Sequence, residues 1–360
     1  MTRTNTVVTG IDLPFGTPSG SMRLLEEIYI FGPLRQRTTT FTLPARHGSR
    51  SRTQNVKWVN PDQVVYSVDR DRYIRALSDL VARQVNSEPD IVHLQHLAFG
   101  MTPALLMAFD RTPAIAFCHG TDLLAAIRSP EEARSMIEIA DRVDRIIFPT
   151  LAMYELCAGL SGLSIASKSE IVPWGVRSSE FELLPPRSGR RYVLFAGRSA
   201  PEKGLQLALP VLNRIRCNAV PLVISDGDVG THALAYVKAL PWQTRDGVRA
   251  ILRKSLAVLI PSTELEAFSL LAVEAQLEGA PVFHSGVPGL AEILGGTGIR
   301  ADFSQPVALA LQIEAFCSKA NSVEWRRISL NGKSNARKYG FDRFIRLIEE
   351  IELDVIGLVQ

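Results

Sequence analysis

Short apolar runs alternate with helix-like amphipathic patterns along most of the chain. In the first half, four apolar runs have the length of buried strands, at residues 6–10, 91–95, 114–118 and 145–149. From residue 192 the same pattern begins again, with apolar runs at residues 192–196, 221–225, 256–260 and 281–284. Turns or helical patterns follow these runs, which is typical of α/β architecture with parallel sheets.

A proline-rich stretch, Pro185-Pro186-Arg-Ser-Gly, separates the two halves and has the composition of a linker. We therefore expect two doubly wound, Rossmann-like domains, over residues 1–183 and 184–340, that face each other across a cleft. Ligands of such sheets bind beyond the carboxyl ends of the strands. The last segment, residues 341–360, has an amphipathic helical pattern.

Composition narrows the class of protein. The chain has 360 residues and 46% hydrophobic residues, enough for two domains with substantial cores. The net charge of +3 is too small to indicate a nucleic-acid partner. No apolar stretch resembles a signal peptide or a membrane-spanning helix, and the four cysteines have no metal-ligand spacing. We therefore expect a cytoplasmic protein with reduced thiols.

Two glutamates stand eight positions apart in the run from Glu266 to Glu274, between two apolar runs. Eight residues are just over two helical turns, so the pattern predicts a helix with both carboxylates near one face. If Glu266 begins that helix, an anionic ligand could meet the N–H groups of the helix end while the carboxylates accept hydrogen bonds from hydroxyl groups. A sugar nucleotide combines these two features.

Two cations follow the apolar run at residues 192–196. Arg198 and Lys203 would stand at the carboxyl end of this strand, where they suit a diphosphate, Arg through a forked geometry and Lys as a point charge. The alternative is an ordinary solvated loop, and the pair by itself does not decide between the two.

Several motifs stand in a particular order: Gly197-Arg198 through Lys203-Gly204, Pro261-Ser262, Glu266-x7-Glu274 and Gly279-x-Pro281-Val282. In the first half, His119-Gly120-x-Asp122 follows an apolar run, and Ile171-Val-Pro-Trp-Gly-Val176 precedes the linker. Together they resemble glycosyltransferase family 4, the large retaining group with the GT-B fold. The final helix, with Tyr339-Gly340 ahead of it, is similar to the family's C-terminal element, which crosses back onto the first domain.

The resemblance implies an acceptor-binding first domain, a nucleotide-sugar-binding second domain and a set of site residues. The implied catalytic residues are His119, Arg198, Lys203 and Glu266. The donor would contact Gly16, Gly20, Gly197, Arg198, Lys203, Leu240, Glu266, Phe268, Ser269, Leu270, Leu271 and Glu274. In this assignment Arg198 and Lys203 bind the diphosphate, Glu274 binds the ribose and Glu266 binds the transferred sugar.

The acceptor would meet the glycine-rich loop at residues 16–21. The implied acceptor residues are Thr17, Ser19, Ser21, His119 and Asp122, although Asp122 equally suits the N-cap of a helix. The chain departs from the family's usual pattern in this loop, where Thr17-Pro18-Ser19 replaces paired glycines, and at Ala267 and Ser269, where the family usually has glycine.

Paired aspartates occur at Asp69-x-Asp71 and Asp226-x-Asp228. The first pair opens a helical pattern, where the helix dipole favours acidic residues, and the second flanks a turn glycine. Because the two cations already suit the diphosphate, we assign neither pair as metal ligands and expect no metal and no other cofactor.

The expected activity is metal-independent transfer of a sugar, with retention, from a nucleotide-diphosphate donor such as a UDP-sugar to a hydroxyl of a small polar acceptor. An aminocyclitol or another sugar is one such acceptor. Three alternatives remain: a lipid or polysaccharide acceptor at a membrane met by the Arg-rich residues 35–57, a sugar-nucleotide epimerase, and a non-catalytic nucleotide-sugar-binding protein. The sequence leaves the donor base, the acceptor and the oligomeric state open.

Overall fold

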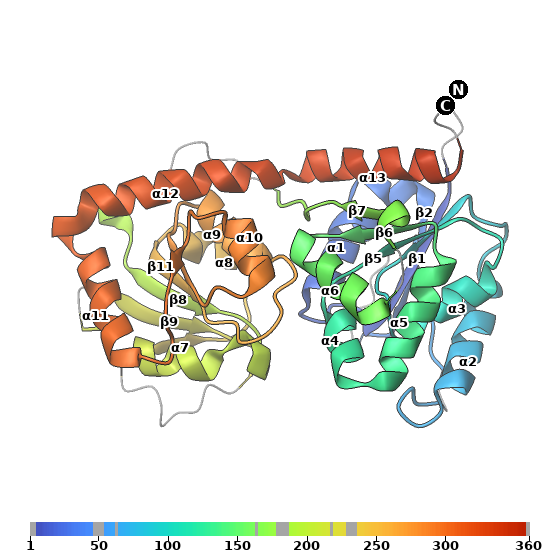
Figure 1. The fold of residues 1–360 in the computed structure, drawn as a ribbon, viewed down its shortest axis with the longest axis horizontal. Coiled ribbons are helices and arrows are strands. Elements are labelled where there is room, and N and C mark those ends of the chain that lie inside the picture. The colour runs from blue at the N-terminus through green and yellow to red at the C-terminus, as the bar shows by residue number, and fades with distance from the viewer. Residues whose placement is uncertain are drawn as a thin grey trace. The chain divides into compact units, whose positions relative to one another are not determined.

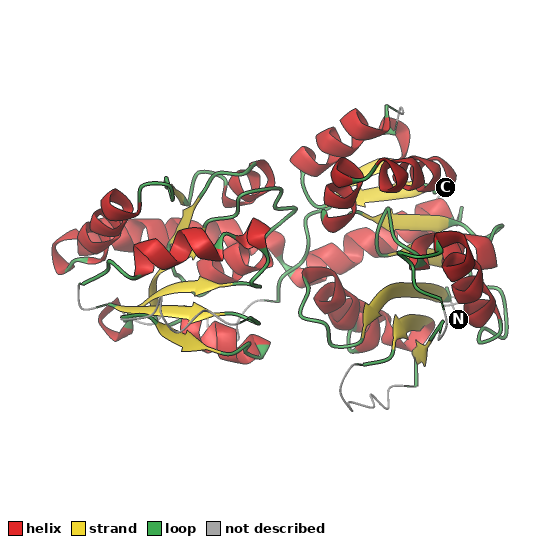
Figure 2. Ribbon diagram, turned by 90° about the horizontal axis from the view of Figure 1, so that it is seen from below, coloured by secondary structure: helices red, strands yellow, loops and turns green. Residues whose placement is uncertain are grey.

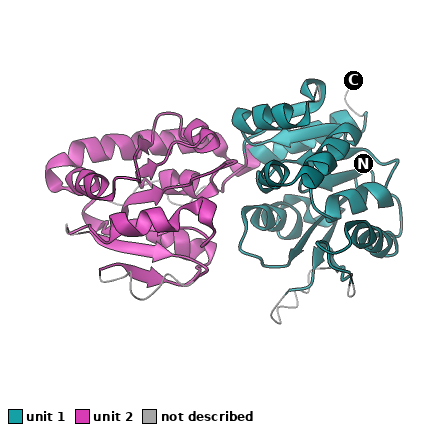
Figure 3. Cartoon of the chain, turned by 60° about the horizontal axis from the view of Figure 1, so that its bottom comes forward, with its two compact units in different colours: residues 1–173, 344–360 teal, residues 174–343 magenta. Residues whose placement is uncertain are grey.

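The computed structural model describes residues 5–45, 54–61, 64–162, 165–177, 187–216, 219–227 and 236–357. The chain forms two compact units, shown in Figure 3: unit 1 comprises residues 1–173 and 344–360, and unit 2 comprises residues 174–343. The prolines that suggested a linker near residue 184 lie outside the described residues.

Unit 1 is built on a parallel sheet. Its seven described strands have the order β3-β2-β1-β4-β5-β6-β7. Their bounds are β1 (Val7–Pro14), β2 (Thr38–Leu43), β3 (Val56–Trp58), β4 (Ile91–Leu94), β5 (Ala114–Phe117), β6 (Arg145–Phe148) and β7 (Ser169–Ile171). All of the pairings are parallel, as the α/β pattern of the sequence predicts.

Helices connect these strands and cover the sheet (Figure 1). They are α1 (Gly20–Leu25), a π-helical turn (Glu26–Ile30), α2 (Arg70–Ala82), α3 (Met101–Ala108), α4 (Thr121–Arg128), α5 (Pro130–Arg142) and α6 (Leu151–Ser161), with short 3-10 turns at Pro33–Arg37 and Ala166–Lys168. The start of α5 shows how local sequence begins a helix. Ser129 caps the helix and Pro130 occupies its first position. Glu131 and Glu132 lie in the first turn, where their negative charge is stabilised by the positive end of the helix dipole.

Unit 2 repeats the architecture with a parallel sheet of order β10-β9-β8-β11-β12-β13 among the described residues. The strands are β8 (Tyr192–Ala196), β9 (Val220–Ile224), β10 (Lys238–Leu240), β11 (Ser255–Ile260), β12 (Val282–His284) and β13 (Ile299–Arg300). All six residues of β11 are buried, because helices lie on both faces of the sheet (Figure 2).

The helices of unit 2 follow its strands in turn. They are α7 (Leu205–Leu212), α8 (Arg245–Leu252), α9 (Leu270–Leu277), α10 (Pro288–Leu294), α11 (Pro306–Cys317) and α12 (Ser322–Ala336), with 3-10 turns at Arg187–Gly189, Pro201–Lys203, Lys319–Asn321 and Arg337–Tyr339. The last helix, α13 (Phe341–Val355), starts in unit 2 and continues into unit 1 from residue 344. Its apolar face, with Phe344, Ile345 and Ile348, is buried.

The order of strands locates the ligand-binding edge of each sheet. In unit 1 the connections diverge between β1 and β4, and in unit 2 between β8 and β11. Parallel doubly wound sheets bind ligands at such a switch point, beyond the carboxyl ends of the strands. The segments after these four strands are therefore the places to look for a site.

Candidate active site

The site in unit 2 is formed by the segments that follow β8 and β11. These strands are parallel neighbours, with Leu194 opposite Val258 and Phe195 opposite Leu259. Their carboxyl ends therefore lie at the same edge of the sheet. The first segment carries Gly197, Arg198 and Lys203, and the second carries Glu266.

Lys203 and Glu266 form an ion pair that joins the two segments. The Lys203 Nζ atom lies 3.0 Å from Glu266 Oε1 and 2.8 Å from Oε2. Ser262 donates to Glu266 Oε2 over 2.9 Å, and Ser285, just after β12, donates to the Ser262 carbonyl oxygen over 2.6 Å. Polar groups from the ends of three neighbouring strands therefore hold the Glu266 carboxylate in place.

Arg198 lies in the same loop and is one-third exposed. Its Nη2 atom is 3.5 Å from Glu202 Oε1, and the Glu202 carbonyl oxygen accepts a hydrogen bond from Thr263 N over 3.0 Å. Arg198 and Lys203 thus both stand beyond β8, as the sequence predicts, and the loop that carries them is tied to the segment after β11.

The helix expected to carry both glutamates is shorter than predicted. It begins at Leu270, four residues after Glu266, because Ser269 adopts a left-handed backbone conformation with φ of 62° that interrupts the helix. The prediction that Glu266 and Glu274 share one helical face is wrong, since Glu266 belongs to the loop. The first N–H groups of α9, near Leu270 and Leu271, have no carbonyl partner within the helix.

Glu274 lies within α9 and is 2% exposed. Its Oε1 atom is 3.4 Å from Nε of Arg245, the first residue of α8. Leu240, which the family resemblance assigns to the donor, ends the edge strand β10 and is exposed. Arg245 was not predicted, and only the position of its helix after β10 could have indicated it.

Two glycines allow the close approaches on which the site depends. A Cβ atom on Gly204, whose φ is +70°, would come within 2.2 Å of the Pro261 carbonyl oxygen. A Cβ atom on Gly289, at the start of α10, would come within 2.0 Å of the Glu266 carbonyl oxygen. Any larger residue at either position would displace the main chain beside the ion pair.

The glycine-rich loop of unit 1 connects β1 to α1. Gly16 has a φ of +78°, and Gly20 is the first residue of α1. Thr17 donates to the Pro14 carbonyl oxygen over 2.6 Å, and the Ser19 hydroxyl accepts from Met22 N over 3.1 Å as the N-cap of α1. Ser21 is buried. The loop's own hydrogen bonds therefore determine its conformation.

Asp122 organises the segments after β4 and β5. Its side chain is fully buried, Oδ1 accepts from Gly120 N and Leu123 N over 2.7 and 3.1 Å, and Oδ2 accepts from Leu97 N and His119 N over 3.0 and 3.3 Å. Gly120, rather than Asp122, occupies the N-cap position of α4. Because main-chain donors occupy both carboxylate oxygens, the geometry favours a structural role over contact with an acceptor.

His119 lies beside two polar residues that the sequence did not indicate. Its Nε2 atom is 3.3 Å from Gln95 Oε1, and its ring centroid is 5.0 Å from that of His96. Burial, with a further contribution from His96, lowers the pKa of His119 to about 3. The imidazole is therefore neutral at physiological pH. The signal for these two polar residues was their position at the end of the apolar run 91–95, which Gln95 closes and His96 directly follows.

One aspartate of each Asp-x-Asp pair has a local hydrogen-bond partner. Asp69 caps α2 by accepting from Arg72 N over 3.1 Å, and Asp226 accepts from Ser199 N over 2.7 Å, whereas Asp228 lies outside the described residues. Across the described ranges, no group of three or more His, Cys, Asp and Glu side chains is arranged to hold a metal ion. Within the same ranges, no helix combines the length and the apolar character needed to span a bilayer.

Two Rossmann-like units, one with a cation–carboxylate site at its switch point, define a fold of the GT-B class. Residues 190–319 match the family Glycosyl transferases group 1, and residues 34–180 match Glycosyltransferase Family 4. The chain belongs to this glycosyltransferase family, which confirms the resemblance seen in its motifs.

The chain is also similar in sequence to individual glycosyltransferases. It is 25% identical over 276 residues to an uncharacterized glycosyltransferase of Methanocaldococcus jannaschii, an alignment that covers 73% of this chain and 74% of the relative. It is 27% identical to the D-inositol 3-phosphate glycosyltransferase of Salinispora tropica, over 74% of this chain and 58% of that protein's length.

Among solved structures, Anabaena HepE in complex with UDP and glucose superposes with a TM-score of 0.78 at 17% identity, over 97% of this chain and 99% of that chain. Sucrose-phosphate synthase from Thermosynechococcus elongatus superposes with a TM-score of 0.76 at 14% identity, over 99% of this chain and 100% of that chain. These two likenesses confirm the GT-B fold.

Proposed function

We propose that this glycosyltransferase moves a sugar, with retention, from a nucleotide-diphosphate donor to a hydroxyl group of a small polar acceptor. The observation that carries the proposal is the Lys203–Glu266 ion pair, 2.8 Å long, beside Arg198 and the start of α9. These groups offer cations and N–H donors to a diphosphate and a carboxylate to hydroxyl groups. A UDP-sugar is the proposed donor, because HepE has been crystallised with UDP and with UDP-glucose.

In the proposed mechanism, the donor diphosphate shares Lys203 with Glu266. Arg198, Lys203 and the N–H groups of Leu270 and Leu271 stabilise the negative charge that grows on the departing phosphate more than they stabilise the ground state. The acceptor attacks from the same face, and the leaving phosphate takes its proton. Because the cations neutralise the diphosphate, the reaction needs no metal.

The remaining residues have binding roles. Glu274 accepts hydrogen bonds from the ribose hydroxyls, and Glu266 accepts them from the transferred sugar. In unit 1, His119 and the loop from Gly16 to Ser21 are proposed to contact sugar hydroxyls. Arg37, in the Arg-rich segment, is 12% exposed and lies 2.7 Å from Glu352, so its guanidinium is engaged within unit 1.

The first experiment is a thermal-shift panel with nucleotide diphosphates and their sugars, because the correct nucleotide raises the melting temperature through its binding free energy. Incubation with the stabilising donor then separates the activities. Transfer to an acceptor, or slow donor hydrolysis, supports the transferase, an epimerised sugar supports an epimerase, and binding without chemistry supports a binding protein. Co-sedimentation with anionic liposomes would favour a membrane acceptor.

We expect Arg198→Ala and Lys203→Ala each to lower donor turnover by about 100-fold or more, because each removes a preorganised charge from the departing phosphate. The control is Arg327→Ala on α12, which removes an exposed arginine paired with Glu324. Near-normal turnover in both site variants would sink the assignment of the diphosphate site.

A further inference from the structure

Gln95 and His119 stand at the ends of adjacent strands of unit 1. Gln95 directly follows β4, and His119 comes two residues after β5, the parallel neighbour of β4. Gln95 is 2% exposed, and its Oε1 atom lies 3.3 Å from His119 Nε2. On distance alone, either the oxygen or the nitrogen of the amide could face the imidazole, because the two differ little in shape.

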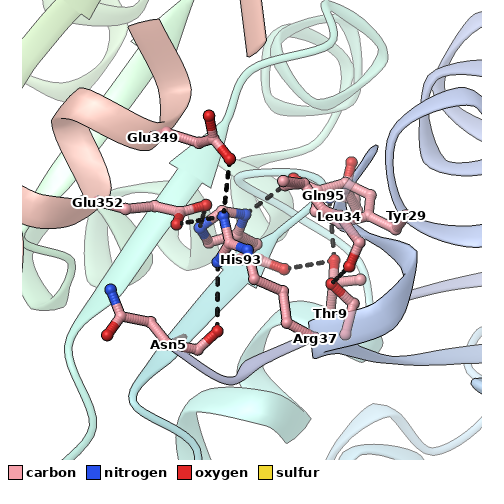
Figure 4. A network of polar contacts seen from close by, with 10 residues as sticks. Asn5, Thr9, Tyr29, Leu34, Arg37, His93, Gln95, Glu349 and Glu352 are labelled. Carbon is pink, nitrogen blue, oxygen red and sulfur yellow. Dashed lines mark hydrogen bonds and ion pairs between the residues drawn. The ribbon is translucent and has the colours of Figure 1, made fainter. Parts of the chain in front are cut away.

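Thr9, on the central strand β1, decides the orientation of that amide. Its hydroxyl lies 2.7 Å from the His93 carbonyl oxygen and 2.9 Å from Gln95 Nε2, and Thr9 is fully buried (Figure 4). A carbonyl oxygen only accepts, so the single hydroxyl proton of Thr9 goes to His93. The Thr9 oxygen must then accept from Gln95, which directs the NH₂ group toward Thr9 and the carbonyl oxygen toward His119.

The same reasoning extends to the imidazole. Since Gln95 Oε1 can only accept, His119 must donate, and Nε2 is the ring atom that carries the proton. The ring is neutral, so Nδ1 is its acceptor atom. Reversing the tautomer would place two acceptors 3.3 Å apart in a buried environment, at the cost of a lost hydrogen bond.

We infer that Thr9 and Gln95 are positioning residues that hold His119 in its Nε2–H tautomer and fix the orientation of the ring that the proposed function places at the sugar hydroxyls. The substrate part rests on the proposed function, whereas the tautomer follows from the contacts themselves. Neither residue touches substrate in this account. His93, whose carbonyl oxygen accepts from Thr9, is itself hydrogen-bonded through its ring: Nδ1 lies 2.8 Å from the Tyr29 hydroxyl (Figure 4).

Histidine labelled with ¹⁵N tests the tautomer directly. Long-range ¹H–¹⁵N spectra at pH 7 distinguish a protonated Nε2 from a protonated Nδ1, and the signal missing from a His119→Asn sample identifies His119. We expect Nε2–H in the wild type and in Thr9→Ser, which keeps the hydroxyl. In the near-isosteric Thr9→Val and in Gln95→Leu we expect Nδ1–H to become populated.

An Nδ1–H tautomer in the wild type, or an unchanged tautomer ratio in Thr9→Val, would overturn the inference. This readout requires no turnover, so its failure differs from a failure of the proposed function. Where turnover is measured, we expect Thr9→Val to lower kcat about tenfold, the scale of one hydrogen bond, with donor KM nearly unchanged. Restoration of kcat in Thr9→Ser separates positioning from a packing defect.

Discussion

Glu266 and Glu274 carry the same side chain but have different surroundings in the fold. Glu266 lies in a loop, where Lys203 and Ser262 hold its carboxylate from two directions. Glu274 lies on α9, almost fully buried and 3.4 Å from Arg245. The two residues are therefore suited to different parts of a donor, and substitutions at them test different contacts.

Glu274→Gln should weaken nucleotide binding about tenfold or more, because a charge-assisted hydrogen bond to a ribose hydroxyl becomes a neutral one. Isothermal titration with UDP measures the change. The matched control is Glu324→Gln on α12, where the carboxylate is exposed and paired with Arg327. Unchanged affinity in Glu274→Gln would contradict the assignment of this residue to the nucleotide.

Loops and helix starts, rather than regular strands, shape the site at the scale of elements. The sequence located eight strands to within a few residues, because buried parallel strands are continuous apolar runs. It missed β2, rich in threonine, and the short edge strands β3, β7, β10 and β13. These segments are too short or too polar to show an apolar periodicity in the sequence. Their strand conformation depends on hydrogen bonding to neighbouring strands, which the local sequence does not reveal.

The contact between α10 and the Glu266 loop gives a test at this scale. Gly289→Ala places a Cβ atom 2.0 Å from the Glu266 carbonyl oxygen, and main chain cannot yield as a flexible side chain can. We expect nucleotide-sugar affinity to fall at least about tenfold, since displaced site residues lose their geometry. Gly189→Ala, with nothing within 4 Å of the added atom, is the control. Equal affinities in the two variants would argue against a role for this contact.

At the scale of the whole molecule, the end of the chain completes the first unit. Residues 344–360 belong to unit 1, although unit 2 precedes them in sequence. Glu352 on α13 is 2% exposed, with Arg37 Nη2 2.7 Å from Oε2 and His93 Nε2 3.3 Å from Oε1 (Figure 4). Burial raises the pKa of Glu352 to about 7 despite the opposing effect of Arg37, and burial lowers the pKa of His93 to about 3.

This buried carboxyl predicts a pH dependence of stability. Between the ordinary pKa of 4.5 and about 7, the folded chain holds a proton at Glu352 that the unfolded chain has released. The stabilisation that the raised pKa of Glu352 gives the folded chain is therefore complete below pH 4.5. It is lost as the pH rises to about 7, and the total change in the free energy of unfolding is on the order of 3 kcal/mol. Over the same range His93, which is neutral in the folded state, acts in the opposite direction.

Comparing the wild type with Glu352→Gln isolates the carboxyl, because both proteins retain His93, Arg37, Glu349 and Tyr29. We expect the free energy of unfolding of the variant, relative to the wild type, to increase from pH 4.5 to 7 and then to remain level. Urea unfolding at a series of pH values measures it. A difference independent of pH would show that Glu352 titrates normally.

The sequence by itself determined the α/β class, most strands of both sheets and the glycosyltransferase family, and it predicted the side chains that are proposed to bind the donor. These depend on local periodicity and on residues whose spacing along the chain already matches their chemistry. The tertiary structure alone decided that Glu266 stands outside α9, that Asp122 is occupied by main-chain donors, and that Thr9, Gln95 and His119 form one hydrogen-bonded series. Residues 9, 95 and 119 come together only because β1, β4 and β5 are adjacent in the sheet, and no local pattern encodes that adjacency.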